Sequence, residues 1–170
     1  TGTCQPGVQD LPPSPEGLAV VGSYAYVADA GQGTIWRYGF ATKQLTAWYS
    51  SSDFTSGNGP SGLARDKDGS LVFTVAETVD AAALLKGALY RLAVDTGGAA
   101  GARTLLATFD SSAAPGPVVV GASGDAYVGL RSAGGVVVVH PNGTVTALVG
   151  VTLVQATADR YADSAALLQA

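Results

Sequence analysis

Few side chains in this 170-residue sequence have the type and spacing that catalysis requires. His140 is the single histidine, so any acid–base chemistry that uses an imidazole must pass through it. It follows a short apolar run and precedes the turn Pro141–Gly143, which predicts a strand-end position on the outer part of a sheet. No Gly-x-Ser-x-Gly nucleophile elbow occurs, and Gly31–Gly33 lacks the final glycine of a dinucleotide-binding loop. The sequence therefore predicts no catalytic residue.

Two positions are candidates for covalent modification. Cys4 is the only cysteine, and an odd cysteine in an oxidising compartment usually pairs with a partner outside the segment; a free thiol is the alternative. Asn142 begins the glycosylation sequon Asn-Gly-Thr, although Asn-Gly is also typical of a tight hairpin turn. Together with the absence of methionine and the low lysine content, the lone cysteine favours an extracellular or lumenal protein.

Aromatic side chains gather in the first third of the sequence. Most of them alternate along strand-like runs and are expected to pack in the interior. Trp48, Tyr49 and Phe54 lie beside the polar run Ser50–Asp53, where an exposed apolar rim suited to protein or carbohydrate contact is one interpretation. Core packing is the preferred interpretation of these three residues.

A repeated sequence motif defines the strands that carry these side chains. Pro15–Ala19 returns as Pro60–Ala64 and, in a degraded form, as Pro115–Val119. Phrases that recur at this distance indicate a repeated supersecondary unit. The second and third units align without a gap from Pro60 and Pro115, whereas the first needs one deletion ahead of Tyr24.

Each unit contains four runs of strand-forming residues, as a four-stranded antiparallel blade requires. Asp68-Gly69 and Asn142-Gly143 supply the residues that tight hairpins need at positive φ. Residues 77–86 are predicted to be an insertion, and residues 96–102 a long hairpin. The predicted strands cover residues 17–21, 24–29, 34–38 and 44–48, then 62–66, 71–76, 88–94 and 103–108, and finally 117–120, 126–130, 136–140 and 144–149.

These phrases resemble the blades of NHL-repeat and gluconolactonase-like β-propellers, the latter including senescence marker protein and strictosidine synthase-like proteins. Tyr26–Asp29 and Ile35–Tyr38 carry the match in the first unit, and Pro60–Phe73 with Leu89–Leu92 in the second. The resemblance covers roughly residues 13 to 150. It implies an all-β propeller fold, in which Asp29 accepts hydrogen bonds from the loop that follows its strand.

The resemblance also implies one candidate metal ligand. Gluconolactonase-like propellers hold a divalent metal, usually calcium, on the ring axis, and Glu16 lies where that family presents an acidic ligand from its first blade. Oxygen ligands suit calcium, and a buried carboxylate needs a cation. The equivalent positions in the other units are Ser61 and Gly116, which lack the expected carboxylate or amide. A loop carboxylate is therefore the preferred interpretation of Glu16.

Three blades are too few for a closed propeller, which has about four to eight. The missing blades come either from other chain segments, which we expect, or from a second copy in a six-bladed ring. Residues 151–155 resemble the start of another strand, and residues 157–170 have helical spacing that predicts a short C-terminal helix. The domain plan is an extension over 1–12, blades over 13–59, 60–114 and 115–150, and a tail over 151–170.

Composition excludes several classes of function. Hydrophobic residues make up 47% of the sequence and charged residues only 13%, so burial must be extensive. The apolar runs are too short to span a membrane, and a net charge of −4 with scattered basic residues gives no nucleic-acid footprint. The sequence predicts a non-catalytic propeller scaffold that binds protein and has no cofactor. The alternative is a calcium-dependent lactonase or esterase-like hydrolase in a completed ring.

Overall fold

A computed structural model describes residues 12–54, 57–79 and 85–150 of the chain. Cys4, the predicted helix at 157–170 and the strand-like segment at 151–155 lie outside the described residues. Within the described ranges, no helix is long and apolar enough to cross a membrane.

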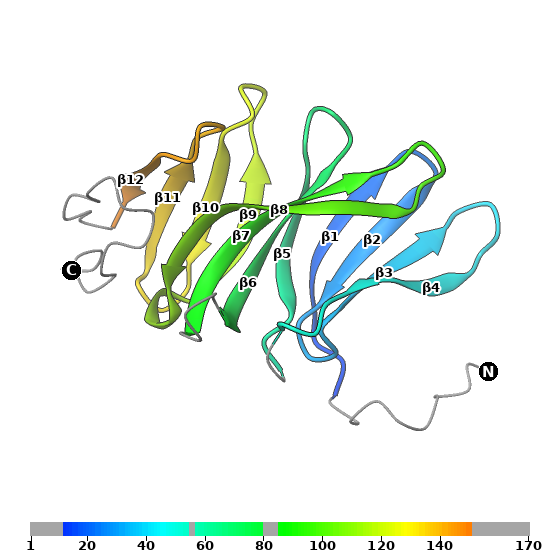
Figure 1. Cartoon of the computed structure of the whole chain (residues 1–170), viewed down its shortest axis with the longest axis horizontal. Coiled ribbons are helices and arrows are strands. Elements are labelled where there is room, and N and C mark those ends of the chain that lie inside the picture. Colours follow the sequence, from blue (N-terminus) through cyan, green and yellow to red (C-terminus); the bar gives the residue numbers. More distant parts are fainter. Residues whose placement is uncertain (1–11, 55–56, 80–84, 151–170) are drawn as a thin grey trace.

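The described residues form three four-stranded antiparallel sheets, and in each sheet the strands follow the order of the chain. This arrangement confirms the predicted all-β fold with three blades. Figure 1 shows the sheets side by side, from the first at the N-terminal end to the third at the C-terminal end. The first blade contains β1 (Pro15–Val21), β2 (Tyr24–Asp29), β3 (Thr34–Gly39) and β4 (Leu45–Ser50). The second contains β5 (Pro60–Arg65), β6 (Leu71–Val79), β7 (Leu85–Val94) and β8 (Ala100–Asp110), followed by the 3₁₀ turn η1 (Ser111–Ala113). The third contains β9 (Pro115–Val120), β10 (Ala126–Leu130), β11 (Gly135–Val139) and β12 (Val145–Val149).

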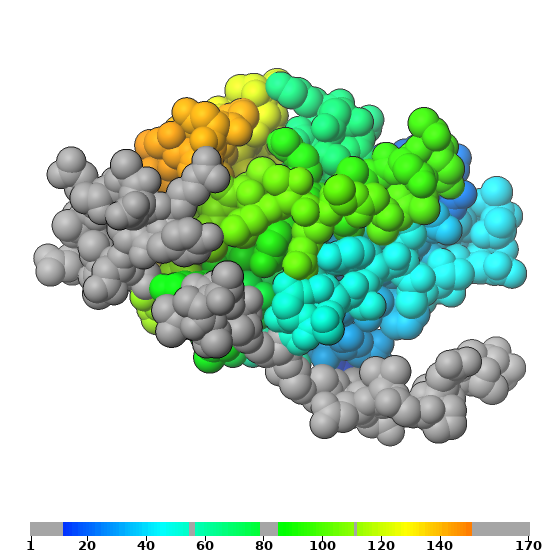
Figure 2. Space-filling view, in the orientation of Figure 1, coloured from blue at the N-terminus to red at the C-terminus, as the bar shows by residue number. Residues whose placement is uncertain are grey.

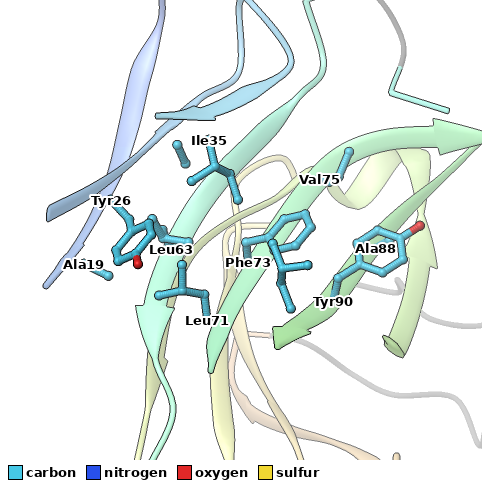
Figure 3. Close-up of a cluster of buried hydrophobic side chains, with 11 residues drawn as sticks. Ala19, Tyr26, Ile35, Leu63, Leu71, Phe73, Val75, Ala88 and Tyr90 are labelled. Carbon is cyan, nitrogen blue, oxygen red and sulfur yellow. The ribbon is translucent and has the colours of Figure 1, made fainter. Parts of the chain in front are cut away.

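The blades contact one another through their first strands, β1 against β5 and β5 against β9. Two hydrophobic cores fill the spaces between neighbouring blades. The first core joins side chains such as Tyr26 and Ile35 of the first blade to Phe73 of the second, as Figure 3 shows. The second core joins Val72 and Leu89 of the second blade to residues of β9, β10 and β11. Each blade therefore has a leading face, toward the preceding blade, and a trailing face, toward the next.

The tight turns follow the predicted chemistry. Gly69 and Gly143 adopt φ values of +87° and +85°, in the left-handed region that glycine tolerates best. In both turns the glycine amide donates to the carbonyl oxygen three residues earlier, in Asp66 and His140. The predictions of hairpins at Asp68-Gly69 and Asn142-Gly143 are thus confirmed.

Two predicted loops in the second blade are shorter than expected. β6 and β7 extend into the predicted insertion, where Thr78 pairs with Lys86, and β8 begins at Ala100, opposite Val94. Glycine and alanine have low strand propensity, but pairing with a neighbouring strand overrides it here. Only residues 80–84, which are not described, and the turn at 95–99 separate these strands.

The strand register aligns the three blades position by position. Pro15 pairs with Asp29, Pro60 with Val75, and Pro115 with Leu130, and an irregularity follows the proline in each blade. Asp29 therefore corresponds to Val75 and Leu130.

Candidate functional site

Glu16 is held by an arginine from the other end of the arc. Its Oε2 accepts a hydrogen bond from the guanidinium of Arg131, which follows β10 in the third blade, and its Oε1 accepts one from the Ser14 hydroxyl at 3.2 Å. The Arg131 side chain passes over Gly116, where a Cβ would collide with it. Gly116 occupies the position at which the resemblance would place a ligand in the third blade, and this position lies directly beneath the Arg131 side chain.

Ser61, the equivalent position in the second blade, is buried in a hydroxyl network. Its Oγ lies 3.0 Å from the Oγ1 of Thr74. Thr74 donates to the carbonyl oxygen of Gly116 at 2.6 Å and accepts from the amide of Gly62 at 2.8 Å. These hydroxyls tie the second blade to the third, and they are already occupied as hydrogen-bonding groups.

The described residues contain no group of three or more His, Cys, Asp or Glu side chains that could hold a metal ion. Glu16 already pairs with the guanidinium group of Arg131, so a calcium ion would have to displace this side chain to bind the carboxylate. The geometry favours a structural ion pair at this position. The pair connects the first and third blades across the second.

Calcium is expected to leave the melting temperature of this protein unchanged, because Arg131 already neutralises Glu16. Thermal unfolding with and without millimolar calcium measures this, with Glu16→Gln as the control variant. A ligand that binds only the folded state raises its stability by mass action. A calcium-dependent rise that Glu16→Gln abolishes would contradict the expectation and favour the hydrolase alternative.

Asp29 has the structural role that its sequence context predicts. The residue is buried, with 3% exposure, and its Oδ1 accepts hydrogen bonds from the amides of Ser14 at 2.9 Å and Gln32 at 3.1 Å. The bond from Gln32 comes from the loop that follows the strand, as expected. The carboxylate therefore fixes the chain at the entrance to the first blade.

The aromatic residues considered for an exposed rim lie in the space between the first two blades. Trp48, Tyr49 and Phe54 are partly buried against the first core. A register irregularity between β3 and β4 accounts for this placement, because it turns both Trp48 and Tyr49 toward the second blade. Burial raises the pKa of the Tyr49 phenol. Core packing, the preferred interpretation from the sequence, thus describes these residues, and contact with a partner through them stays a prediction.

The β7–β8 hairpin fastens the first blade to the second. The carbonyl oxygen of Gly98 accepts hydrogen bonds from Trp48 Nε1 at 2.8 Å and Arg37 Nη1 at 2.5 Å. Figure 2 shows this yellow-green hairpin lying against the cyan strands of the first blade. Arg103 of β8 adds a two-pronged ion pair with Asp53, at 2.6 and 3.1 Å.

His140 joins the two hairpin ends of the third blade. Its Nδ1 lies 2.8 Å from Asp125 Oδ1, and its Nε2 lies 3.2 Å from the hydroxyl of Thr146. Hydrogen bonds from Ser123 and then from His140 hold the pKa of the Asp125 carboxyl below its usual range. In the adjacent turn, Asn142 Oδ1 accepts from the Thr144 amide at 2.9 Å, and modification of Asn142 stays a prediction. His140 and Asp125 are half-buried, and the cluster lies at the tip of the blade.

The leading face of the first blade is apolar and open to solvent. Leu18, Val20 and Leu45 are 64%, 50% and 58% exposed. Beside them lies a pocket of about 310 Å³, whose walls are mainly apolar. Its lining residues are Pro13, Pro15, Val27, Asp29, Gln32, Trp36 and Leu45. No sequence motif marked this surface, because its residues come from four strands.

In the other two blades, the same register positions form the cores. Val27 pairs with Leu18 in the first blade, as Phe73 pairs with Leu63 in the second. Phe73 is fully buried, as is Val128, the equivalent residue of the third blade. The first blade thus exposes the kind of surface that its neighbours bury.

The trailing face of the third blade has the same character. Val119, Tyr127 and Leu148 are 64%, 37% and 55% exposed. Val119 corresponds in register to Ala19, which is buried in the first core, and to Ala64, which packs against the second. Among the described residues, both ends of the arc therefore present a blade face that no other blade covers.

Comparison with known proteins supports the fold. No protein-family model and no curated protein matches this chain. Among solved structures, an oxidoreductase of Thermus thermophilus described as a glucose dehydrogenase is similar, with a TM-score of 0.58 and 18% identity over 76% of this chain and 44% of that protein. An auxiliary nutrient binding protein from Bacteroides thetaiotaomicron has a TM-score of 0.54 and 16% identity over 73% of this chain and 32% of that protein.

The solved structures that resemble this chain are β-propeller-like, which agrees with the three blades seen here. At these identities the likeness shows the fold alone. The chain spans less than half the length of the two solved structures.

Proposed function

We propose that this chain is a non-catalytic arc of a β-propeller that binds further blades through its two end faces. The observation that carries the proposal is the equivalence in register between the exposed end faces and the faces buried in the two cores. Val27 occupies the position of Phe73, and Trp36 that of Tyr90. An exposed face whose residues match those of a buried core is expected to be buried by a partner.

The energetics favour such a partner. Full burial of a leucine or valine side chain is worth about 1.5–3 kcal/mol relative to its exposure. Large contiguous apolar patches are rare on monomeric proteins and mark interaction sites. Leu18, Val20 and Leu45, with the pocket beside Trp36, form such a patch on one face of one sheet. Association with another blade face would remove these side chains from water.

A photo-crosslinking amino acid at Leu18 tests the proposal. Benzoylphenylalanine at this position is expected to give a strong crosslink to a polypeptide of defined mass in cells that produce the full protein. Mass spectrometry of the crosslinked peptide should identify a propeller strand. Leu105 of β8 provides the matched control, because it is 47% exposed but lies away from both end faces. Equal crosslinking at the two positions, or none at Leu18, would contradict the proposal.

A further inference from the structure

We propose that the partner of both end faces is a second copy of this chain, so that two three-bladed arcs close into one six-bladed ring. This inference rests on the proposed function and names its partner. A ring of six lies within the range of about four to eight blades that closed propellers adopt. The leading face of each copy would meet the trailing face of the other, at two identical seams related by a two-fold axis.

The interior of the arc shows which residues would meet at each seam. Ala19 on the trailing face of the first blade and Leu63 on the leading face of the second share the first core. Ala64 and Val118 share the second core in the same way. The corresponding pair at the seam is Val119 of one copy and Leu18 of the other. Both are 64% exposed in the single arc.

The trailing face of the third blade also differs from the interior trailing faces at one position of its first strand. Gly17 and Gly62 let the first strand of the next blade approach so closely that a Cβ would collide with its backbone. In the third blade Pro117 takes this position, and it is exposed. A proline there prevents the same close approach. At the seam the first strands would therefore lie further apart than β1 and β5 do, and the leading face of the first blade has a pocket of about 310 Å³ beside Pro15.

Charge supports the same pairing. The trailing faces of the first two blades carry Arg37 and Arg91, which occupy equivalent register positions. In the third blade Val138 takes that position, paired with Tyr127. The trailing face of the third blade thus has no cation at this position, where Val138 is only 7% exposed. This suits the apolar surface formed by Leu18, Val27 and Trp36.

Complementary charges at the seam test the ring. Light scattering of the full chain over a concentration series should give twice its 16.9 kDa mass. Leu18→Asp alone and Val119→Lys alone should each give monomers. In a homodimer of either variant, both seams would place a charged side chain against an apolar one. An equimolar mixture should recover the dimer, with one unaltered seam and one seam that pairs Asp with Lys.

Other outcomes overturn the inference in distinguishable ways. A dimer that survives Val119→Lys alone would mean that leading faces pair with each other. A wild-type monomer whose Leu18 crosslinks to blades of another polypeptide would overturn the second copy as the partner while leaving the proposed function intact. A monomer in which Leu18 crosslinks to nothing would overturn both. Recovery of the dimer in the mixture also shows that both variants are folded.

Discussion

Replacing Phe73 by alanine is expected to destabilise the protein by about 3–5 kcal/mol, the usual loss for a buried phenylalanine. Phe73 is fully buried on β6, and its ring centroid lies 5.4 Å from that of Tyr90, 6.1 Å from that of Tyr49 and 6.2 Å from that of Phe54. The substitution would remove the ring on which the first core is centred. Equilibrium unfolding in urea at a fixed protein concentration measures the loss.

Phe40→Ala is the matched control for this experiment. Phe40 follows β3 in a turn and is 40% exposed, so a change of only about 0.5 kcal/mol is expected. Equal destabilisation by the two substitutions would show that the interface between the first and second blades does not govern stability. It would also contradict the packing described for the first core.

Replacing Gly62 by alanine is expected to force the second and third blades apart. A Cβ at this position would collide with the carbonyl oxygen of Gly116 and approach the hydroxyl of Thr74. Overpacking of this kind costs about 1–3 kcal/mol. Displacement of the buried Thr74 hydroxyl from its partners adds about 1–3 kcal/mol. The fall in the urea midpoint of unfolding would measure the combined effect.

Gly129→Ala provides the comparison, because it adds the same methyl group to β10, which pairs with β9 in the third blade. Its Cβ would make only ordinary contacts, the nearest at 3.5 Å to Pro117. Little change is expected in this variant. If Gly62→Ala unfolded at the same urea concentration as Gly129→Ala, the close approach of β5 to β9 would not be needed for this fold.

Much of the fold could be predicted because its determinants are local. The phrases at Pro15, Pro60 and Pro115 each begin the first strand of a blade, and Gly69 and Gly143 close hairpins that require a positive φ. Repetition let weak signals in one unit support those in the next. The blade plan follows from such features without knowledge of any contact between blades.

The candidate site was harder to predict because it depends on contacts between blades. Arg131 lies 115 positions from Glu16 in sequence, and no local pattern relates the two. The direction of Tyr49 depends on one irregularity between β3 and β4, which places it on the same face as Trp48 instead of the opposite face expected from strict alternation. The substitution of proline for glycine at position 117 is visible in the repeat. Its structural consequence becomes clear only from the close contacts that Gly17 and Gly62 make with the backbone of the next blade.

The two cores each link only consecutive blades, and this connectivity bears on how the chain acquires its structure. Every strand pairs with a strand adjacent in sequence, so most contacts within a blade close short loops. Coupling between neighbouring units lets order spread from one blade to the next. The first two blades can therefore form a complete core, shared by Tyr26 and Phe73, while the third is still being synthesised. The arc is thus suited to folding during translation, with closure of the ring as a separate and later event.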